Sequence, residues 1–425
     1  MAGTSIVNRH RGAAESTRHN ARFDDRTCNQ LSCLCSVRSV SFRRVSEVDG
    51  GISSPSGRKH DGCLSIQFRA APRKPREATI TTYRLYQKSG HPIFAVPILP
   101  RRLRLAGIAR YQPYTFKRAA YRRAMELAIR LGVDRLLGTT VDQPVGPEDG
   151  FQFNGWLNQV RGALEDDRAS AVVFWPPQTS RRRIYVHLFD ASQKPIGFAK
   201  ISFGDEDDRL LMREADILVQ QTEAGVRSFR VPRVLAVGET DAGHQWLVTA
   251  PLPERTRPIG RHYNAYPDQI VAALSGEHRL VPHTEMTALS WWPEDLVTNG
   301  PEVTEFGHEL EALVANEGVK VCRVHGDFGL QNMVIDRGGT RWVFDWEQSR
   351  PDGPVMADQV SFFLALDPAR TLADPLSALR RFHEQFLKKA SPQRRCQIMM
   401  ALAFRHATGA LDAGLFINNW AKQGR

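Results

Sequence analysis

The sequence predicts an α+β fold of two lobes, a small antiparallel-sheet N-lobe and a helical C-lobe, with a basic, partly disordered N-terminal extension before them. Three observations lead to this prediction. Short apolar or alternating runs, separated by turn-prone residues, fill residues 169–250. Helical spacing prevails after residue 255. The last run of the first region ends at Pro251, where a linker between the lobes is expected.

The N-terminal extension, residues 1–75, has no sustained helix or strand period and is rich in Ser, Arg and Gly, so we expect it to be largely disordered. Residues 1–90 hold 16 Lys and Arg against 7 Asp and Glu, and residues 91–135 hold 10 against 2. The basic excess behind the net charge of +11 therefore belongs to the N-terminal third.

The cysteines and the apolar runs limit the location of the chain. Four of its six cysteines lie in the first 63 residues, at a spacing that fits no zinc site. Free thiols in a reducing compartment are favoured over disulfides, which predicts a cytoplasmic location. No apolar run reaches the ~18 residues of a membrane-spanning helix. We therefore expect no membrane partner.

Residues 76–165 are predicted to form an N-terminal accessory region. An extended apolar stretch broken by prolines covers 91–100, and an amphipathic helix is predicted over 114–131. Its apolar face consists of Phe116, Ala120, Ala124, Leu127 and Leu131.

The sheet lobe is predicted over residues 166–252. Strands are expected at 171–175, 183–189 and 196–203, and their turn-prone connections indicate an antiparallel meander. A helix with an acidic start is expected at 207–222, followed by strands at 231–237 and 245–250.

The helical lobe is predicted over residues 253–425, with catalytic and metal-binding loops. A helix is expected at 305–317, and short strands at 320–324, 333–335 and 341–344. Further helices are predicted at 356–366 and 376–387, with more helix between 393 and 415.

Three polar residues cluster around these short strands. Asp327 and Asn332 lie in one loop, and Asp345 follows the next apolar strand. A hairpin of such strands would bring the three side chains together. Carboxylate and amide oxygens suit a hard cation such as Mg²⁺, which would neutralise acidic groups that are otherwise costly to bury.

The pattern H-G-D-x-x-x-x-N, followed by a strand and D-x-E, resembles the aminoglycoside phosphotransferase and choline kinase families, which have a protein-kinase-like fold. It is carried here by His325, Gly326 and Asp327, then Asn332, then Asp345 and Glu347. The resemblance implies that Asp327 accepts or orients a substrate hydroxyl and that His325 holds the loop geometry. It also implies that Asn332 and Asp345 bind Mg²⁺ bridging the phosphates of ATP.

Two upstream features fit the same resemblance. Lys200 lies inside an alternating strand and Glu214 on the next helix, and in kinase-like folds such a pair holds the α- and β-phosphates. Ala250 and Leu252 flank the proline of the linker, where backbone groups would bind adenine. Alone, the lysine would read as a solvent-face residue and the linker as an ordinary strand end.

Two departures from kinase patterns bear on function. The loop 176–183, PPQTSRRR, lacks the glycines that let backbone N–H groups approach phosphate, although its arginines or Ser180 could contact phosphate directly instead. Trp346 and Glu347 stand where protein kinases have Phe-Gly, and no A-P-E follows. The second departure favours a small-molecule kinase over a protein kinase.

The predicted function is an ATP- and Mg²⁺-dependent phosphotransferase acting on a small-molecule hydroxyl. Aminoglycoside, choline, a sugar and an amino alcohol all stay open as acceptors, and no oligomeric state is indicated. A cationic acceptor would use acidic residues of the helical lobe such as Glu285, Glu309 and Glu311.

Two other interpretations remain. The alternative is a catalytically silent kinase-like module that binds a nucleotide or another ligand. A third, an N-terminal arm that binds nucleic acid, predicts salt-sensitive binding, but the arginines lack interleaved aromatics, so no nucleic-acid partner is expected.

Overall fold

The computed structural model describes residues 82–88, 90–98, 100–110, 116–144, 151–176, 182–258, 270, 278–289, 291–292, 305–366 and 368–420. The extension 1–75, with its four cysteines, lies outside the described residues, and so does the middle of the glycine-free loop.

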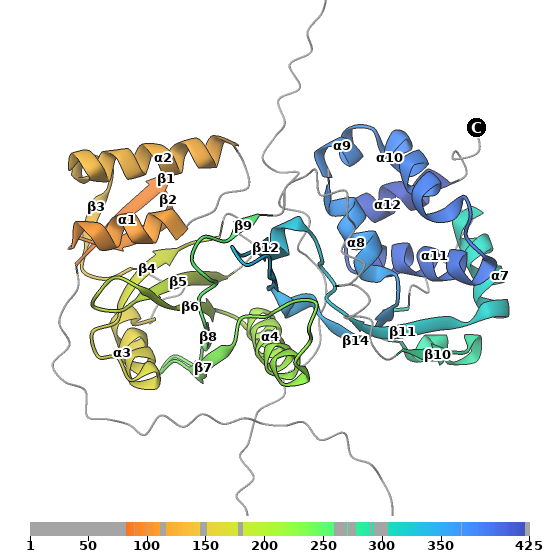
Figure 1. Ribbon diagram of the computed structural model, residues 1–425, viewed down its shortest axis with the longest axis horizontal. Coiled ribbons are helices and arrows are strands. Elements are labelled where there is room, and N and C mark those ends of the chain that lie inside the picture. The colour runs from red at the N-terminus through yellow and green to blue at the C-terminus, as the bar shows by residue number, and fades with distance from the viewer. Residues whose placement is uncertain are drawn as a thin grey trace, which may run out of the picture.

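Eight strands form one antiparallel sheet in the order β3-β1-β2-β4-β5-β6-β8-β7 (Figure 1). Their bounds are β1 Tyr83–Lys88, β2 His91–Pro97, β3 Thr139–Val141, β4 Ser170–Phe174, β5 Arg183–Phe189, β6 Pro195–Ser202, β7 Val234–Glu239 and β8 Gln245–Thr249. The five strands from β4 to β8 are those predicted for the sheet lobe. The three before them come from the predicted accessory region, so the sheet is larger than expected.

Strand alternation gives this sheet two different faces. Ile184 and Val186 of β5 point to one face and join a core with Trp156 of helix α3 (Phe153–Leu164). Tyr185 of β5 and Lys200 of β6 are direct cross-strand partners on the other face. Helices cover this second face from two sides. Their bounds are α1 Arg101–Arg110, α2 Phe116–Leu131 and α4 Asp205–Ala224.

Helix α2 forms where it was predicted, but its buried face is a different one. Met125 and Ile129 are 2% and 0% exposed and pack against the sheet. Ala120, Ala124 and Leu127, which belong to the predicted apolar face, are exposed. The helix carries apolar residues on two sides, and the side with Met125 and Ile129 is the one that packs in a cluster with Phe94 and Val172.

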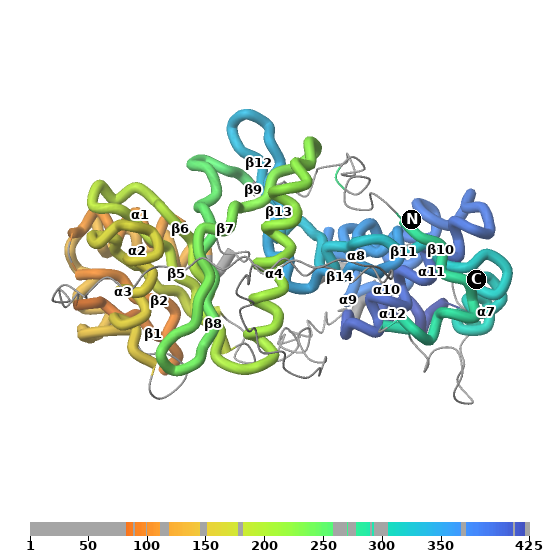
Figure 2. The backbone as a smooth tube through the Cα atoms, turned by 90° about the horizontal axis from the view of Figure 1, so that it is seen from below, coloured from red at the N-terminus to blue at the C-terminus, as the bar shows by residue number. Residues whose placement is uncertain are grey.

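The second lobe combines helices with two small sheets, ordered β10-β11-β14 and β13-β12-β9. The strand bounds are β9 Arg257–Pro258, β10 Arg279–Val281, β11 Val319–Val324, β12 Met333–Ile335, β13 Arg341–Val343 and β14 Arg350–Pro354. The helix bounds are α7 Glu305–Glu317, α8 Ala357–Leu366, α9 Pro368–Ala373, α10 Pro375–Phe382, α11 Pro392–Ala407 and α12 Leu411–Asn418. Figure 2 shows the two lobes side by side, with α4 and β12 near their junction.

The core of the helical lobe is centred on α11. Nine consecutive residues, 396–404, are buried there, and all of them except Gln397 are apolar, as expected for a helix segment that is packed on every side. Cys322 and Cys396 belong to this core and are free thiols. In the part of the chain that the structure describes, no helix is long and apolar enough to cross a membrane.

Candidate active site

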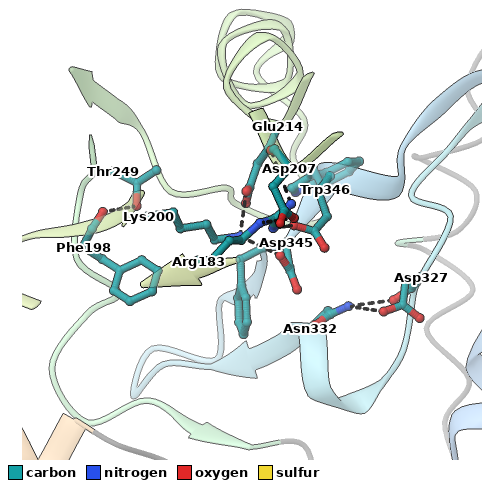
Figure 3. A network of polar contacts seen from close by, with 12 residues as sticks. Arg183, Phe198, Lys200, Asp207, Glu214, Thr249, Asp327, Asn332, Asp345 and Trp346 are labelled. Atoms are coloured by element: carbon teal, nitrogen blue, oxygen red, sulfur yellow. Dashed lines mark hydrogen bonds and ion pairs between the residues drawn. The ribbon is translucent and has the colours of Figure 1, made fainter. Parts of the chain in front are cut away.

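The predicted hairpin brings Asp327, Asn332 and Asp345 to one place. β12 pairs antiparallel with β13, and the Phe344 N–H donates to the Asn332 carbonyl over 3.1 Å. The Asn332 Nδ2 donates to the Asp327 carbonyl at 2.7 Å and to its Oδ2 at 3.3 Å (Figure 3). This use of Nδ2 leaves the amide oxygen of Asn332 as the atom for a cation.

The His-Gly-Asp turn is held by groups from the helical lobe. Buried Asp358, on α8, accepts the backbone N–H of His325 at 2.8 Å and that of Gly326 at 3.0 Å. Gly326 has φ +87°, and a Cβ there would collide with the Gln348 carbonyl. His325 is fully buried and its Nε2 donates to the Phe344 carbonyl at 3.0 Å. The histidine therefore ties the turn to the strand that leads to Asp345.

Asp327 points toward the open side of this turn. Its side chain is 43% exposed, and its Oδ1 lies 3.9 Å from the Arg405 guanidinium of α11. Dense packing on its protein side raises the pKa of Asp327, while Arg405 and His325 act in the opposite direction. A carboxylate that is accessible and held in this way can accept a hydrogen bond from a substrate hydroxyl.

Lys200 joins the two lobes electrostatically. Its Nζ lies 2.6 Å from the Glu214 Oε2 on α4 and 2.6 Å from the Asp345 Oδ1 (Figure 3). Burial by itself lowers the pKa of Lys200, but Asp345 and Glu214 raise it well above its usual range, so the ammonium stays charged. The strand lysine is thus a buried member of the cluster and not a solvent-face residue.

A second buried ion cluster lies beside the first. Arg183, at the start of β5, has a fully buried side chain, pairs with Glu347 and lies 2.7 Å from the Asp207 Oδ1 of α4. The arginines of loop 176–183, Arg183 among them, were predicted as possible direct contacts to phosphate, whereas the structure pairs Arg183 with Glu347 and Asp207. Asp358 was not predicted, because the sequence does not show which partner neutralises a buried charge.

The donor set fits a divalent cation at Asp345. Among the described residues, carboxylate oxygens of Glu214, Asp345 and Glu347 come within 4.8 Å of one another. All three carboxylates contact a cationic side chain, Glu214 and Asp345 through Lys200 and Glu347 through Arg183, but Asp345 is 33% exposed and is the most accessible of the three. Asp345 has φ +68° and ψ +57°, an uncommon conformation for an aspartate that turns its side chain toward this cluster.

The linker and the neighbouring strands shape the region predicted for adenine. The Ala250 N–H donates to the Arg233 carbonyl at 2.7 Å, so this linker N–H already has a partner within the sheet lobe. Leu252 lies half-buried in the segment that follows. Phe198, two residues before Lys200, stacks on Tyr185 at 6.0 Å and lies 5.0 Å from the ring of His187. This half-buried aromatic row was not predicted, although period-two alternation places it on the lysine face.

Two other features bear less directly on the site. A hollow of about 490 Å³ is lined by Arg182, Asp208 and His244, near the starts of β5, α4 and β8, and Lys200, Glu214 and Asp345 do not line it. Glu309 pairs with Arg395 and accepts the Trp420 indole N–H at 2.9 Å, so it serves packing of α7 on α11.

One protein-family model matches part of the chain. Residues 198–387 match the phosphotransferase enzyme family, a segment that contains Lys200, Glu214 and the whole His-Gly-Asp to Asp-Trp-Glu stretch. The resemblance predicted from the motifs is thereby confirmed over this segment. No curated protein matches the chain in sequence.

Several solved structures resemble the chain in part. The crystal structure of aminoglycoside phosphotransferase APH(4)-Ia is 14% identical, with 64% of this chain and 96% of that chain covered and a TM-score of 0.40. Choline kinase LicA from Streptococcus pneumoniae is also 14% identical, with 64% and 91% covered and a TM-score of 0.35. The GDP complex of aminoglycoside 2'-phosphotransferase-IIIa is 11% identical, with 63% and 94% covered and a TM-score of 0.37.

Proposed function

We propose that the chain is an ATP- and Mg²⁺-dependent phosphotransferase that acts on a hydroxyl of a small molecule. The observation that carries the proposal is the position of Lys200, whose Nζ lies 2.6 Å from both Glu214 and Asp345. Through these two contacts Lys200 links the sheet lobe to the acidic loop beside Asp327. Phosphoryl transfer needs such a link, because the nucleotide phosphates are held between the two lobes.

Each residue of the cluster has a role in this proposal. Asp345 and the amide oxygen of Asn332 would hold Mg²⁺, which would neutralise charge on the phosphates. Glu214 orients Lys200 toward the α- and β-phosphates. Asp327 accepts the hydrogen bond of the acceptor hydroxyl and aligns its oxygen for attack, and His325 keeps the turn in place.

The nucleotide base would lie between the sheet lobe and the linker. We assign the linker backbone at Ala250 and Leu252 to binding of the base, and Phe198 and Tyr185 offer aromatic surface on the Lys200 face of the sheet. The cytoplasm, where ATP and free thiols coexist, is the compartment that suits this chemistry.

A catalytically silent, nucleotide-binding module is the second candidate. The glycine-free loop 176–183 favours it, because prolines and arginines hinder close approach of backbone N–H groups to phosphate. Arg183, at the end of that loop, is already bound to Glu347 and Asp207. The accessible Asp327 carboxylate favours the enzyme instead.

A screen of acceptors separates the two candidates. ATP consumption by the full chain is measured with Mg²⁺ across hydroxyl compounds that include aminoglycosides, choline, sugars and amino alcohols, and the same compounds are tested without Mg²⁺. The enzyme shows acceptor-stimulated turnover that requires Mg²⁺ and is lost in Asp327→Asn. Binding of Mg·ATP without turnover for any acceptor would favour the silent module.

A further inference from the structure

Helix α2 leaves an apolar stripe on the outside of the molecule. Ala120, Ala124, Leu127 and Leu131 recur at helical spacing, and all four are exposed, with Leu127 at 56% and Leu131 at 67%. The buried side of the helix uses Met125 and Ile129 instead. In the part of the chain that the structure describes, the stripe is therefore not used for packing.

The stripe continues beyond the end of the helix. Val133 is 43% exposed, and Leu136 and Leu137, in and after the 3₁₀ turn Asp134–Leu136, are 78% and 55% exposed. We call Leu127, Leu131, Val133, Leu136 and Leu137 the leucine patch. It holds five of the eight large exposed hydrophobic side chains of the described residues, within 11 consecutive positions. Such clustering marks an interaction surface, whereas single exposed leucines do not.

The surface around the leucine patch is basic. Residues 101–137 contain ten Lys and Arg and only two acids. Asp134 is buried against Arg104 and the Tyr86 hydroxyl, and Glu126 pairs with Arg122 at 3.4 Å. Both acids are thus engaged inside the region, while Arg123, Arg130 and Arg135 are exposed beside the leucines.

The location of the patch suits a flat partner. In Figure 1, α2 lies at the outer edge of the sheet lobe, on the side away from the helical lobe. The leucines project from a helix and from the turn that follows it. Projecting leucines flanked by arginines are the arrangement that inserts into the boundary between lipid headgroups and acyl chains.

We propose that α2 and the turn after it dock the protein on an anionic membrane surface. The leucine patch enters the interfacial layer, and Arg123, Arg130 and Arg135 contact acidic lipid headgroups. Docking of this kind needs only one apolar face, so it does not require the long apolar run that a spanning helix needs.

The basic charge around the leucine patch argues against two other occupants, the N-terminal segment of this chain and a second copy of it. Residues 1–81 hold 14 Lys and Arg against 7 acids, so this segment would bring like charge to the patch. A second copy of the chain, related by two-fold symmetry, would bring the same basic surface to both sides of the interface. An anionic bilayer complements both the leucines and the arginines.

The test is co-sedimentation of the full chain with phosphatidylcholine vesicles, with and without phosphatidylglycerol. The double variant Leu131→Glu/Leu136→Glu removes insertion, and Arg123→Gln/Arg130→Gln removes headgroup contacts. Leu280→Glu, at a residue as exposed as Leu127 but in the other lobe, is the matched control. Circular dichroism and nucleotide binding check that every variant is folded.

The proposal predicts binding to the phosphatidylglycerol vesicles that weakens with salt. The leucine double variant should bind roughly tenfold or more weakly, and each arginine lost should cost about fivefold. The control should bind like the wild type. The proposal is overturned if the chain does not bind anionic vesicles. It is also overturned if the leucine variant binds them as well as the control does, because the basic N-terminal residues would then account for the binding. It is also overturned if light scattering shows a dimer that the leucine variant abolishes, since a second copy would then cover the patch.

Discussion

The proposed nucleotide site depends on Lys200, whose ammonium group contacts both Glu214 and Asp345. Lys200→Ala removes the ammonium that lies 2.6 Å from both the Glu214 Oε2 and the Asp345 Oδ1, and Glu214 is only 3% exposed. We expect a loss of up to about 3 kcal/mol in the free energy of unfolding and a clear weakening of Mg·ATP affinity. Lys194→Ala, in the exposed turn before β6, is the control. Equal affinity and turnover in Lys200→Ala and wild type would reject the role of the pair.

His187 gives the second prediction at this scale. Its ring packs against Phe174 and Phe198, and burial, aided by Arg110, lowers its pKa to about 3. The unfolded chain binds a proton near pH 6.5 and the folded chain does not, so stability is full above pH 6.5 and falls toward pH 3. The loss should approach about 1 kcal/mol per pH unit. Urea denaturation of wild type and His187→Phe between pH 4 and 7 measures this dependence of stability on pH. If the unfolding free energies of the two proteins changed with pH in parallel, His187 would not be its cause.

The individual residues of the site were predictable to different degrees. Asp327, Asn332 and Asp345 were predicted to converge because a short hairpin brings the residues at its two ends together, and the structure has that hairpin. Asp358 could not be found in this way. It lies on an otherwise apolar helix turn, and its partners, the N–H groups of His325 and Gly326, are backbone atoms that carry no sequence signal.

At the scale of elements, the pair of Arg183 and Glu347 ties β5 to the loop after β13. Arg183→Leu should cost about 3–5 kcal/mol, because Glu347 stays buried without its cation. The double variant Arg183→Leu/Glu347→Leu should recover a large part of this loss. Chemical denaturation of the two single variants and the double variant measures the coupling. Additive losses would mean that the two side chains act independently.

Most elements were predicted by their apolar period, and several bounds agree with the structure to the residue, among them β5, β12 and α7. The buried face of α2 was not predicted correctly. Two apolar stripes run along that helix, and the sequence does not state which of them meets the sheet. Contact with Phe94 and Val172, which lie on strands distant in sequence, decides the choice.

The whole molecule is organised around the eight-stranded sheet. The pairing of β2 with β4 makes the strands of residues 83–141 part of the same sheet as Lys200. A chain that starts at residue 166 should therefore expose the β4 edge together with the face covered by α1 and α2, and should aggregate. A chain that starts at residue 76 should stay monodisperse and fold. Size-exclusion chromatography and circular dichroism compare the two, and a folded, cooperative 166–425 fragment would contradict the prediction.

The two-lobe plan was predicted from the change of period near residue 255, and the structure has both lobes. The union of the accessory strands with the kinase-like strands was not predicted. Alternation shows that a segment is a strand, but β2 and β4 are separated by about 70 residues, and alternation does not name a strand's neighbour. The backbone groups at the edge of β4 pair with β2. Helix α1 packs on the same face of both strands and supports this pairing.

The central claim, phosphoryl transfer to a hydroxyl oriented by Asp327, is tested most directly by measuring nucleotide affinity and turnover together on Asp327→Asn. Among the described residues, Asp327 makes no hydrogen bond or ion pair with Lys200 or Glu214, and its side chain is 43% exposed. We predict that kcat falls by about 10²–10⁴-fold while Mg·ATP affinity stays close to that of the wild type. If affinity collapsed along with turnover, Asp327 would be a structural or metal-binding residue. Unchanged turnover in Asp327→Asn would contradict the account itself.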